Sequence, residues 1–312
     1  MTDETNVIDE ETLRRISGRK VNILITGATG AGKSSTINAL FNGEPAKVGT
    51  TANPETKTID SYQLGNLTVW DSPGLGDGQE ADNRHAADIQ RLLTAKDENG
   101  DMLIDAVLVV VNGGSAKLKT TYELINKVIV PCLGNEASKR LVIGINQADV
   151  ANDGDGWNET MHQPEPELSL YLKKKEQSMQ NRIAQETGIS VQPVSYSAGY
   201  KEEGEPQEPS YNMLKLCDLI LSTVPSEKRL PLLGQTNQKM EVWKSNDEEI
   251  AKYITHIREQ VRQDEDGAKV LKAVESGVAV GGLLGSFIPF VGTGLGALIG
   301  GGIGLIGSLF GD

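Results

Sequence analysis

The sequence predicts an α/β fold with a mostly parallel sheet covered by helices on both faces, followed by a C-terminal helical region. Apolar, strand-like runs alternate with helix-like segments, which is typical of parallel sheets. Polar or glycine-rich motifs follow several of these runs, at the strand ends where such sheets bind ligands. The expected strands are 21–26, 57–63, 67–70, 106–111, 140–146 and 191–195, and the expected helices are 33–42, 82–94, 119–130, 166–187 and 211–223.

The 312 residues are enough for one large α/β domain and a smaller appendix. We expect a polar N-terminal helix at 1–18, the main domain at 19–228, a linker and an amphipathic helix at 229–275, and a glycine-rich hydrophobic helical hairpin at 276–312. The net charge of −13 argues against broad nucleic-acid binding, which needs clustered Lys and Arg side chains against phosphates. We therefore expect no nucleic-acid partner.

The most informative motif is Gly-Ala-Thr-Gly-Ala-Gly-Lys-Ser at residues 27–34, directly after the first expected strand and before a helix-like segment. This is the phosphate-loop pattern G-x-x-x-x-G-K-[ST]. Its glycines allow backbone N–H groups to wrap a phosphate chain, and the start of the next helix adds a positive dipole end. Lys33 supplies a positive charge to the phosphates, and the hydroxyl of Ser34 can bind Mg²⁺.

A second motif, Asp71-Ser72-Pro73-Gly74, ends the expected strand at 67–70. The Asp71 carboxylate can hold Mg²⁺ through water, and the N–H of Gly74 can sense the terminal phosphate. Between the two motifs lies a polar stretch that contains Thr50 and Thr51. A threonine hydroxyl there could complete the Mg²⁺ shell, and we favour Thr51 over Thr50; the alternative is a polar loop without a ligand role.

A third motif, Asn146-Gln147-Ala148-Asp149, follows the buried-strand run at 140–146. The Asp149 carboxylate can accept hydrogen bonds from N1–H and the 2-amino group of guanine, a pair of donors that adenine lacks. The pair Ser197-Ala198 follows the next expected strand, where backbone N–H groups can contact guanine O6. The motifs together therefore indicate a guanine nucleotide.

With these motifs the chain resembles P-loop GTPases of the Ras-like superfamily, in the Era/TrmE-like bacterial branch, over about residues 19–228. Its phosphate loop is also similar to that of interferon-inducible immunity-related GTPases. The resemblance implies a P-loop GTPase domain that binds GTP or GDP with Mg²⁺. It implies catalytic roles for Lys33, Thr51 and Gly74, metal binding by Ser34, Thr51 and Asp71, and nucleotide binding by Gly27, Ala28, Thr29, Gly30, Ala31, Gly32, Lys33, Ser34, Ser35, Asp71, Gly74, Asn146, Gln147, Asp149, Ser197 and Ala198.

Three positions depart from the pattern of that superfamily. Gln147 replaces the lysine whose stem normally covers the base, and Leu75 stands where Ras-like enzymes place a water-orienting glutamine. Potassium-activated relatives carry an asparagine where this chain has Gly30. We therefore expect slow intrinsic hydrolysis, which rises when a partner, or a second copy across the nucleotide face, completes the site.

The C-terminal segment 276–311 contains no charged residue, and glycines recur every fourth position within each of its halves. Pro289 separates the halves, so we expect a helical hairpin with small residues at its seam. We favour association with a membrane or a helical partner; the alternatives are a soluble hairpin covered by the protein itself and a flexible tail. Upstream, Ser245–Glu248 resembles a capping box, and Ile250, Tyr253, Ile254, Ile257 and Val261 recur at helical spacing.

Three functions fit this sequence. The first is a cytoplasmic switch that hydrolyses GTP and that lies at the membrane surface or inserts its tail. The second is an effector that holds GTP, hydrolyses little, and oligomerises at a membrane through the glycine-rich hairpin. The third, a ribosome-assembly GTPase, follows from the family branch alone and is opposed by the acidic charge.

Overall fold

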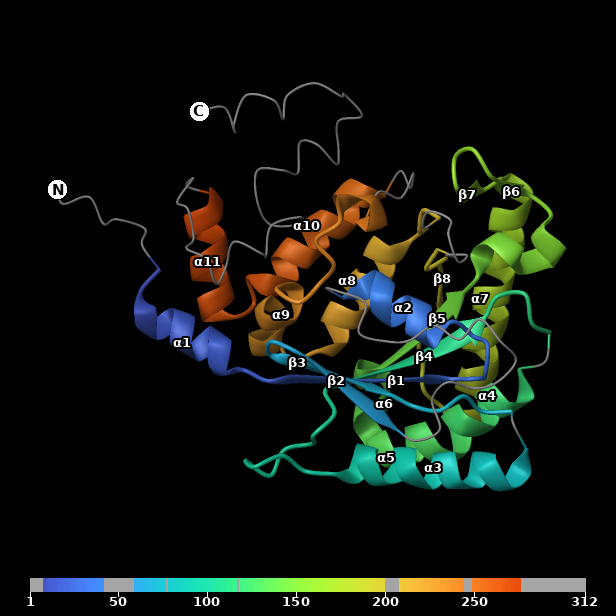
Figure 1. Ribbon diagram of the computed structural model, residues 1–312, viewed down its shortest axis with the longest axis horizontal. Coiled ribbons are helices and arrows are strands. Elements are labelled where there is room, and N and C mark those ends of the chain that lie inside the picture. Colours follow the sequence, from blue (N-terminus) through green and yellow to red (C-terminus); the bar gives the residue numbers. More distant parts are fainter. Residues whose placement is uncertain are drawn as a thin grey trace.

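A six-stranded sheet runs through the computed structural model (Figure 1), which describes residues 8–41, 59–76, 78–116, 118–199, 208–243 and 249–275. Its strand order is β2-β3-β1-β4-β5-β8. Strand β2 is antiparallel to β3, and the other neighbours are parallel, which confirms the predicted fold class. The strands are β1 (Val21–Gly27), β2 (Asp60–Leu64), β3 (Leu67–Asp71), β4 (Ala106–Asn112), β5 (Leu141–Asn146) and β8 (Val194–Ser195).

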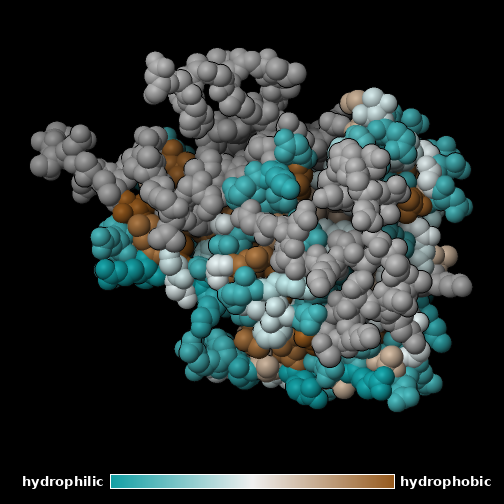
Figure 2. Space-filling model, in the orientation of Figure 1, coloured by the Kyte–Doolittle hydropathy of each residue, from teal (hydrophilic) through white to brown (hydrophobic). Residues whose placement is uncertain are grey.

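Helices cover the two faces of this sheet (Figure 1). One face carries α2 (Lys33–Leu40), α8 (Met213–Thr223), α9 (Ser226–Leu233) and α10 (Ile250–Val261), with α1 (Glu10–Gly18) and α11 (Glu265–Glu275) beside them. The other face carries α3 (Gln79–Thr94), α4 (Lys119–Leu124), α5 (Val130–Leu133), α6 (Ala137–Arg140) and α7 (Pro166–Thr187). Where Figure 2 shows described residues, hydrophobic side chains form small separate areas among hydrophilic ones.

The sheet can be covered on both faces because its central strands are apolar on both sides. All residues of β1 and of β5 are buried. In β4, Leu108 and Val110 belong to the core under α2 and α8, whereas Val107 and Val109 belong to the core over α3 and α7. This alternation is the two-residue period of a strand.

Two expected elements have a different extent because of proline. The helix expected at 119–130 continues to Leu133, but a π-helical turn, η1 (Ile125–Ile129), separates α4 from α5. Pro131, which follows this turn, has no N–H to donate to a carbonyl of the preceding turn. The strand expected at 191–195 forms only at Val194–Ser195, since Pro193 cannot donate to a strand ladder.

A polar insertion follows the third motif, between β5 and α7, and it contains short regular elements. Two short 3₁₀ turns, together labelled η3 (Ala148–Gly154) and separated by non-helical backbone at Ala151–Asp153, lead into a hairpin of β6 (Trp157–Asn158) and β7 (Gln163–Pro164). The rings of Trp157 and Tyr211 meet edge to face, with centroids 5.7 Å apart. This contact fixes the insertion against the segment that leads into α8.

The structure corrects the linker that we predicted at the start of 229–275. The chain forms α9 and a 3₁₀ turn, η4 (Met240–Trp243), and both pack into the main core. Leu230, Leu232, Leu233 and Trp243 are buried there. The helix was hard to see from the sequence because it is short and contains Pro231, so no apolar stripe recurs over several turns.

The N-terminal and C-terminal helices close over one side of the domain. The apolar stripe of α10 packs on α8, and Ile16 of α1 lies in the same core. Arg15 and Arg19 each reach the Asp266 carboxylate at 2.7 Å, and Arg19 also reaches Asp264 at 2.9 Å. We call these four side chains the α1–α11 clasp.

Several predictions lie outside the described residues. They concern Thr51, the capping box at Ser245–Glu248 and the glycine-rich hairpin at 276–312. Among the helices that the structure does describe, none combines the length and the apolar character needed to cross a membrane.

The α1–α11 clasp predicts how stability depends on Asp266. We expect Asp266→Ala to lower the free energy of unfolding by about 2–3 kcal/mol, because two guanidinium groups lose a carboxylate that is only 4% exposed. The hydrogen bond from Arg15 lowers the pKa of Asp266. Its contribution is therefore complete above the ordinary carboxyl pKa and is lost as the pH falls through the lowered folded value.

Urea unfolding of wild type and variant, at about pH 7 and again at about pH 3, measures both effects. The neighbouring Glu265→Ala is the matched control, since the Glu265 side chain is 82% exposed and its removal should cost less than about 0.5 kcal/mol. Equal losses in the two variants would show that the clasp does not stabilise the fold.

Candidate functional site

The loop between β1 and α2 has a backbone that requires glycine at several positions. Gly30 and Gly32 have φ angles of +74° and +86°. A Cβ atom at Gly27 would lie 2.1 Å from the carbonyl oxygen of Val110, and one at Gly32 would lie 2.2 Å from Nδ2 of Asn146. The loop therefore turns tightly against the ends of β4 and β5, and the N-terminus of α2 follows it, as in an anion-binding loop.

Lys33 is the first residue of α2 and is buried. Its Nζ atom lies 3.2 Å from the carbonyl oxygen of Ala28 and 3.4 Å from that of Gly27. The ammonium group is thus folded back over the loop, where a phosphate held by loop N–H groups would meet its charge. Ser34 and Ser35 follow in the first turn of α2 and are partly exposed.

Asp71 ends β3, and its backbone lies opposite Ile25 of β1. The Asp71 side chain is 1% exposed, and neither carboxylate oxygen has a hydrogen-bond partner among the described residues. Burial raises the pKa of Asp71 to about 6, although the nearby Lys33 charge acts in the opposite direction. An unpartnered buried carboxylate is costly for a folded protein. Together with the Ser34 hydroxyl it offers the hard oxygen donors that fit Mg²⁺.

The chain after Asp71 runs directly against the phosphate loop. The N–H of Thr29 donates to the carbonyl of Leu75 at 2.9 Å, and the N–H of Leu75 donates to the carbonyl of Gly27 at 3.2 Å. A Cβ atom at Gly74 would lie 2.2 Å from Oγ1 of Thr29, so only glycine allows this approach. The Leu75 side chain is 4% exposed and packs into the core on the α3 side.

Asn146 joins the loops after β1 and β8 from the end of β5. Its Nδ2 donates to the carbonyl of Ala31 at 3.0 Å, and its Oδ1 accepts from the N–H of Ala198 at 3.0 Å. Asn146 is 2% exposed, so these bonds form away from water. The amide therefore holds the phosphate loop and the Ser197-Ala198 loop at a fixed separation.

The next residues, 147–149, form the turn that we expect to bind the base, and we call it the base-binding turn. Gln147 has a φ of +63°, and its Nε2 donates to the carbonyl of Gly30 at 3.2 Å. Gln147 thus contacts the phosphate loop although it lacks the charge of a lysine. One carboxylate oxygen of Asp149 is buried and has no hydrogen-bond partner among the described residues. Like Asp71, Asp149 has unused acceptor capacity at the edge of the sheet.

The Ser197-Ala198 loop is held mainly through its backbone. Ser197 exchanges two backbone hydrogen bonds with Tyr211, at 3.0 and 2.9 Å. The N–H of Ala148 donates to the carbonyl of Tyr196 at 3.1 Å, which places this loop beside the base-binding turn. The structure therefore brings the phosphate loop, Asp71, Asn146, Asp149 and Ala198 to one edge of the sheet, while Thr51 lies outside the described residues.

Sequence analysis missed a second link between these loops. The hydroxyl of Tyr196 lies 2.7 Å from Oγ1 of Thr36, and the Thr36 hydroxyl donates to the carbonyl oxygen of Gly32 at 2.8 Å. Burial raises the pKa of Tyr196, so it remains a neutral phenol. The ring lies on Gly144, where a Cβ atom would be 2.8 Å from it. In the sequence, only Gly144 inside a buried strand could have indicated this contact, because a glycine there often marks the close approach of another group.

Comparison with known proteins relates one part of the chain to a known family. Residues 22–147 match the family described as 50S ribosome-binding GTPase. The uncharacterized protein YfjP of Escherichia coli (strain K12) is 30% identical over 137 residues, or 43% of this chain and 44% of YfjP. The tRNA modification GTPase MnmE of Halorhodospira halophila (strain DSM 244 / SL1) is 25% identical over 178 residues, or 56% of this chain and 33% of MnmE. The chain thus spans less than half the length of either relative.

Among solved structures, Toc33 from Arabidopsis thaliana in complex with Mg²⁺ and GMPPNP is 16% identical, with a TM-score of 0.42 over 64% of this chain and 82% of that chain. The family match runs from Asn22 to Gln147 and so includes the phosphate loop, Asp71 and Asn146. Residues 22–147 of this chain therefore form a P-loop GTPase domain that matches the family described as 50S ribosome-binding GTPase.

Proposed function

We propose that this chain binds GTP with Mg²⁺ and hydrolyses it slowly to GDP and phosphate, as a switch. The observation that carries the proposal is the state of two carboxylates at one edge of the sheet: Asp71 is buried with both oxygens unpartnered, and Asp149 has one buried, unpartnered oxygen. Asp71 lies near the Lys33 charge, and Asp149 lies on the base-binding turn. Acceptors left without partners at these two places suit a cation beside phosphates and a base with two donors.

Different residues of the site would bind the phosphates, bind Mg²⁺ and respond to the terminal phosphate. Lys33 and the backbone of Gly27–Ser35 would hold the phosphates, while Ser34, Thr51 and Asp71 would hold Mg²⁺. The ion would neutralise charge on the phosphate oxygens. Gly74 packs against Thr29, so its backbone would lie beside the phosphate loop and could respond to the terminal phosphate.

Slow hydrolysis is supported by the position of Leu75. Its backbone is bonded to the phosphate loop, and its side chain is buried in the core rather than directed toward solvent. An apolar side chain in that place cannot orient a water molecule. A partner, or a second copy that faces the nucleotide, would then supply what is missing; an arginine supplied in this way raises rates by roughly 10³–10⁵.

Single-turnover hydrolysis of GTP by the purified chain tests this proposal. We expect a rate below about 0.01 s⁻¹, which is typical of GTPases that lack a supplied arginine. Leu75→Gln should not raise this rate by more than about threefold and should destabilise the protein, because its amide would be buried in an apolar core. A rate of tens per second in the isolated wild type would refute slow intrinsic hydrolysis.

Base recognition gives a second test. We expect Asp149→Asn to weaken GDP binding by at least about 100-fold, because the amide offers one acceptor where guanine presents two donors. Calorimetric titration with GDP and with ADP measures the change. Asp153→Asn is the matched control, since Asp153 is exposed in the same insertion and should leave affinity unchanged. Similar losses in both variants would argue against a contact between Asp149 and the base.

We further propose that the segment 276–311 associates with a membrane and that GTP controls its release. The support is the sequence itself: 36 consecutive residues carry no charge, and apolar surface of that extent is normally covered. The acidic chain would not be drawn to anionic lipid, so the attachment would be hydrophobic. The alternative function is an effector that holds GTP, hydrolyses little of it and oligomerises. The buried Leu75 agrees with this alternative as well, because its side chain cannot help to hydrolyse GTP.

Flotation with phosphatidylcholine vesicles tests the membrane proposal. We expect more protein to float with a non-hydrolysable GTP analogue than with GDP, and we expect Ile299→Asp to abolish flotation while GDP affinity is unchanged. Equal flotation in both nucleotide states would reject nucleotide control. Single-turnover hydrolysis with and without the same vesicles separates the two functions, because an effector would show little hydrolysis in either condition.

A further inference from the structure

The exposed large hydrophobic side chains of the described residues are concentrated in one short part of the chain. They are Val150, Met161, Leu170 and Tyr171. Leu170 and Tyr171 are 53% and 38% exposed and adjacent on the first turns of α7. Isolated exposed apolar residues are ordinary, but a cluster confined to one segment indicates a contact surface.

Helix α7 has two distinct faces. Its inner face is anchored by Leu168, Leu172, Met179 and Ile183, which are all buried. The outer face begins with Glu167, Leu170, Tyr171 and Lys174, which are all exposed. These four positions are spaced three, four and seven residues from the first, so they form one continuous strip on a helix. We call them the α7 strip.

We propose that the α7 strip binds a second copy of this chain, in an antiparallel pair of α7 helices related by a two-fold axis. The strip is its own complement. Glu167 and Lys174 are equally far in sequence from the point midway between Leu170 and Tyr171. An axis through that point places Glu167 of each copy opposite Lys174 of the other, and Leu170 opposite Tyr171, as an isologous interface requires.

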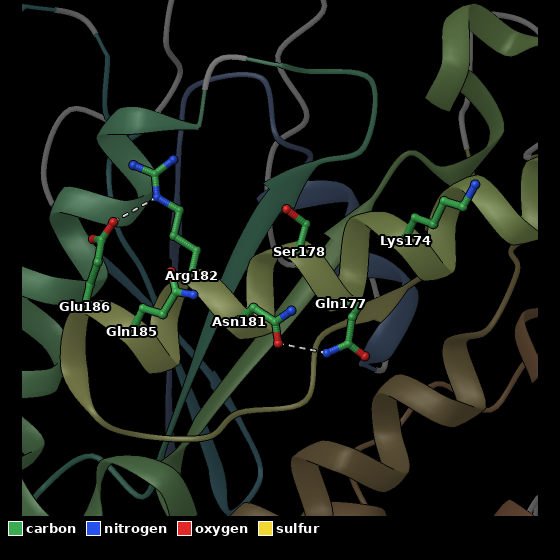
Figure 3. A pocket seen from close by; sticks show the side chains of 7 residues that line it. All are labelled: Lys174, Gln177, Ser178, Asn181, Arg182, Gln185 and Glu186. Atoms are coloured by element: carbon green, nitrogen blue, oxygen red, sulfur yellow. Dashed lines mark hydrogen bonds and ion pairs between the residues drawn. The ribbon is translucent and has the colours of Figure 1, made fainter.

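The charges at the ends of the strip are available for such a contact. Neither Glu167 nor Lys174 makes an ion pair with any residue that the structure describes. Farther along α7 the polar side chains already bond to each other, as Figure 3 shows. Nε2 of Gln177 donates to Oδ1 of Asn181 at 2.9 Å, and Nε of Arg182 lies 2.9 Å from Oε1 of Glu186.

The charge of the whole chain also favours this face. Two copies with a net charge of −13 each repel one another over most of their surfaces. Helix α7 is different, because its sequence contains four basic and three acidic residues. Two copies can therefore meet along α7 without bringing acidic surfaces together.

The outer face of α7 continues from the strip toward the C-terminal end of the helix. This open face carries polar side chains from Lys174 to Glu186 (Figure 3). In an antiparallel pair, the β6–β7 hairpin of the second copy precedes its α7 and would lie along this half of the helix. Met161, in the turn of that hairpin, is 46% exposed and would lie against this face.

Sedimentation velocity of the full chain, between about 1 and 100 μM, tests the proposal in the range expected for a small interface. We expect a concentration-dependent dimer. Glu167→Lys and Lys174→Glu should each weaken it at least about tenfold, because each variant opposes two pairs of like charges. The double variant should restore the dimer to within about threefold of wild type. A monomer throughout the range, or a double variant as weak as the single ones, would overturn the proposal.

A charge reversal on α1, Glu10→Lys with Arg14→Glu, is the matched control, since that exposed pair lies on a helix remote from α7 (Figure 1). It should leave the dimer unchanged. Leu170→Asp should abolish dimerisation. If association survives Leu170→Asp but is lost in Ile299→Asp, the copies meet through 276–311, and the α7 pairing is wrong.

Cysteine cross-linking tests the register directly. Glu167→Cys combined with Lys174→Cys should form a covalent dimer under mild oxidation, because the two positions face each other across the axis. Either single variant should cross-link at least about tenfold more slowly. The native Cys217 is buried, and Cys132, which is partly exposed, is common to all the variants. Equal cross-linking of single and double variants would contradict the proposed register.

Discussion

The side-chain amide of Asn146 is the contact on which the site depends. It donates to the phosphate loop at Ala31 and accepts from the loop at Ala198, and the two residues are far apart in the sequence. Both bonds are buried, so water does not compete for them. The absence of a side chain at Gly32 lets this amide approach the phosphate loop, since a Cβ atom there would lie 2.2 Å from Nδ2. One residue thus sets the distance between the two parts of the nucleotide site.

Around this amide the site keeps two polar groups that the fold itself does not satisfy. Asp71 is buried with no partner among the described residues, and one oxygen of Asp149 is in the same state. Most buried polar atoms in folded proteins are hydrogen-bonded, so unpartnered carboxylate oxygens beside a phosphate loop are candidates for contact with a ligand. The raised pKa of Asp71 reflects the same cost, because burial disfavours its charged form. A bound cation and nucleotide would offset this free-energy cost and so stabilise the folded protein.

The predicted elements agreed with the structure where a pattern extends over several turns or strand residues. β1, β4, β5 and α7 were recognised because their apolar residues recur over a long enough segment. The predictions were less accurate where proline interrupts a pattern, as at Pro131 and Pro193. The linker predicted after the main domain was wrong because α9 is short and packs through three leucines whose burial depends on the rest of the core.

By itself the sequence determined the order of the motifs and the local shape of each one, because a glycine turn between a strand and a helix is a property of neighbouring residues. It also identified Asp71 and Asp149 as acceptors at strand ends. The tertiary structure alone decided how these pieces meet. The Tyr196–Thr36 hydrogen bond, the α1–α11 clasp and the burial of Leu75 join segments that are distant in the chain. Such contacts depend on packing in three dimensions, which no local pattern of residues encodes.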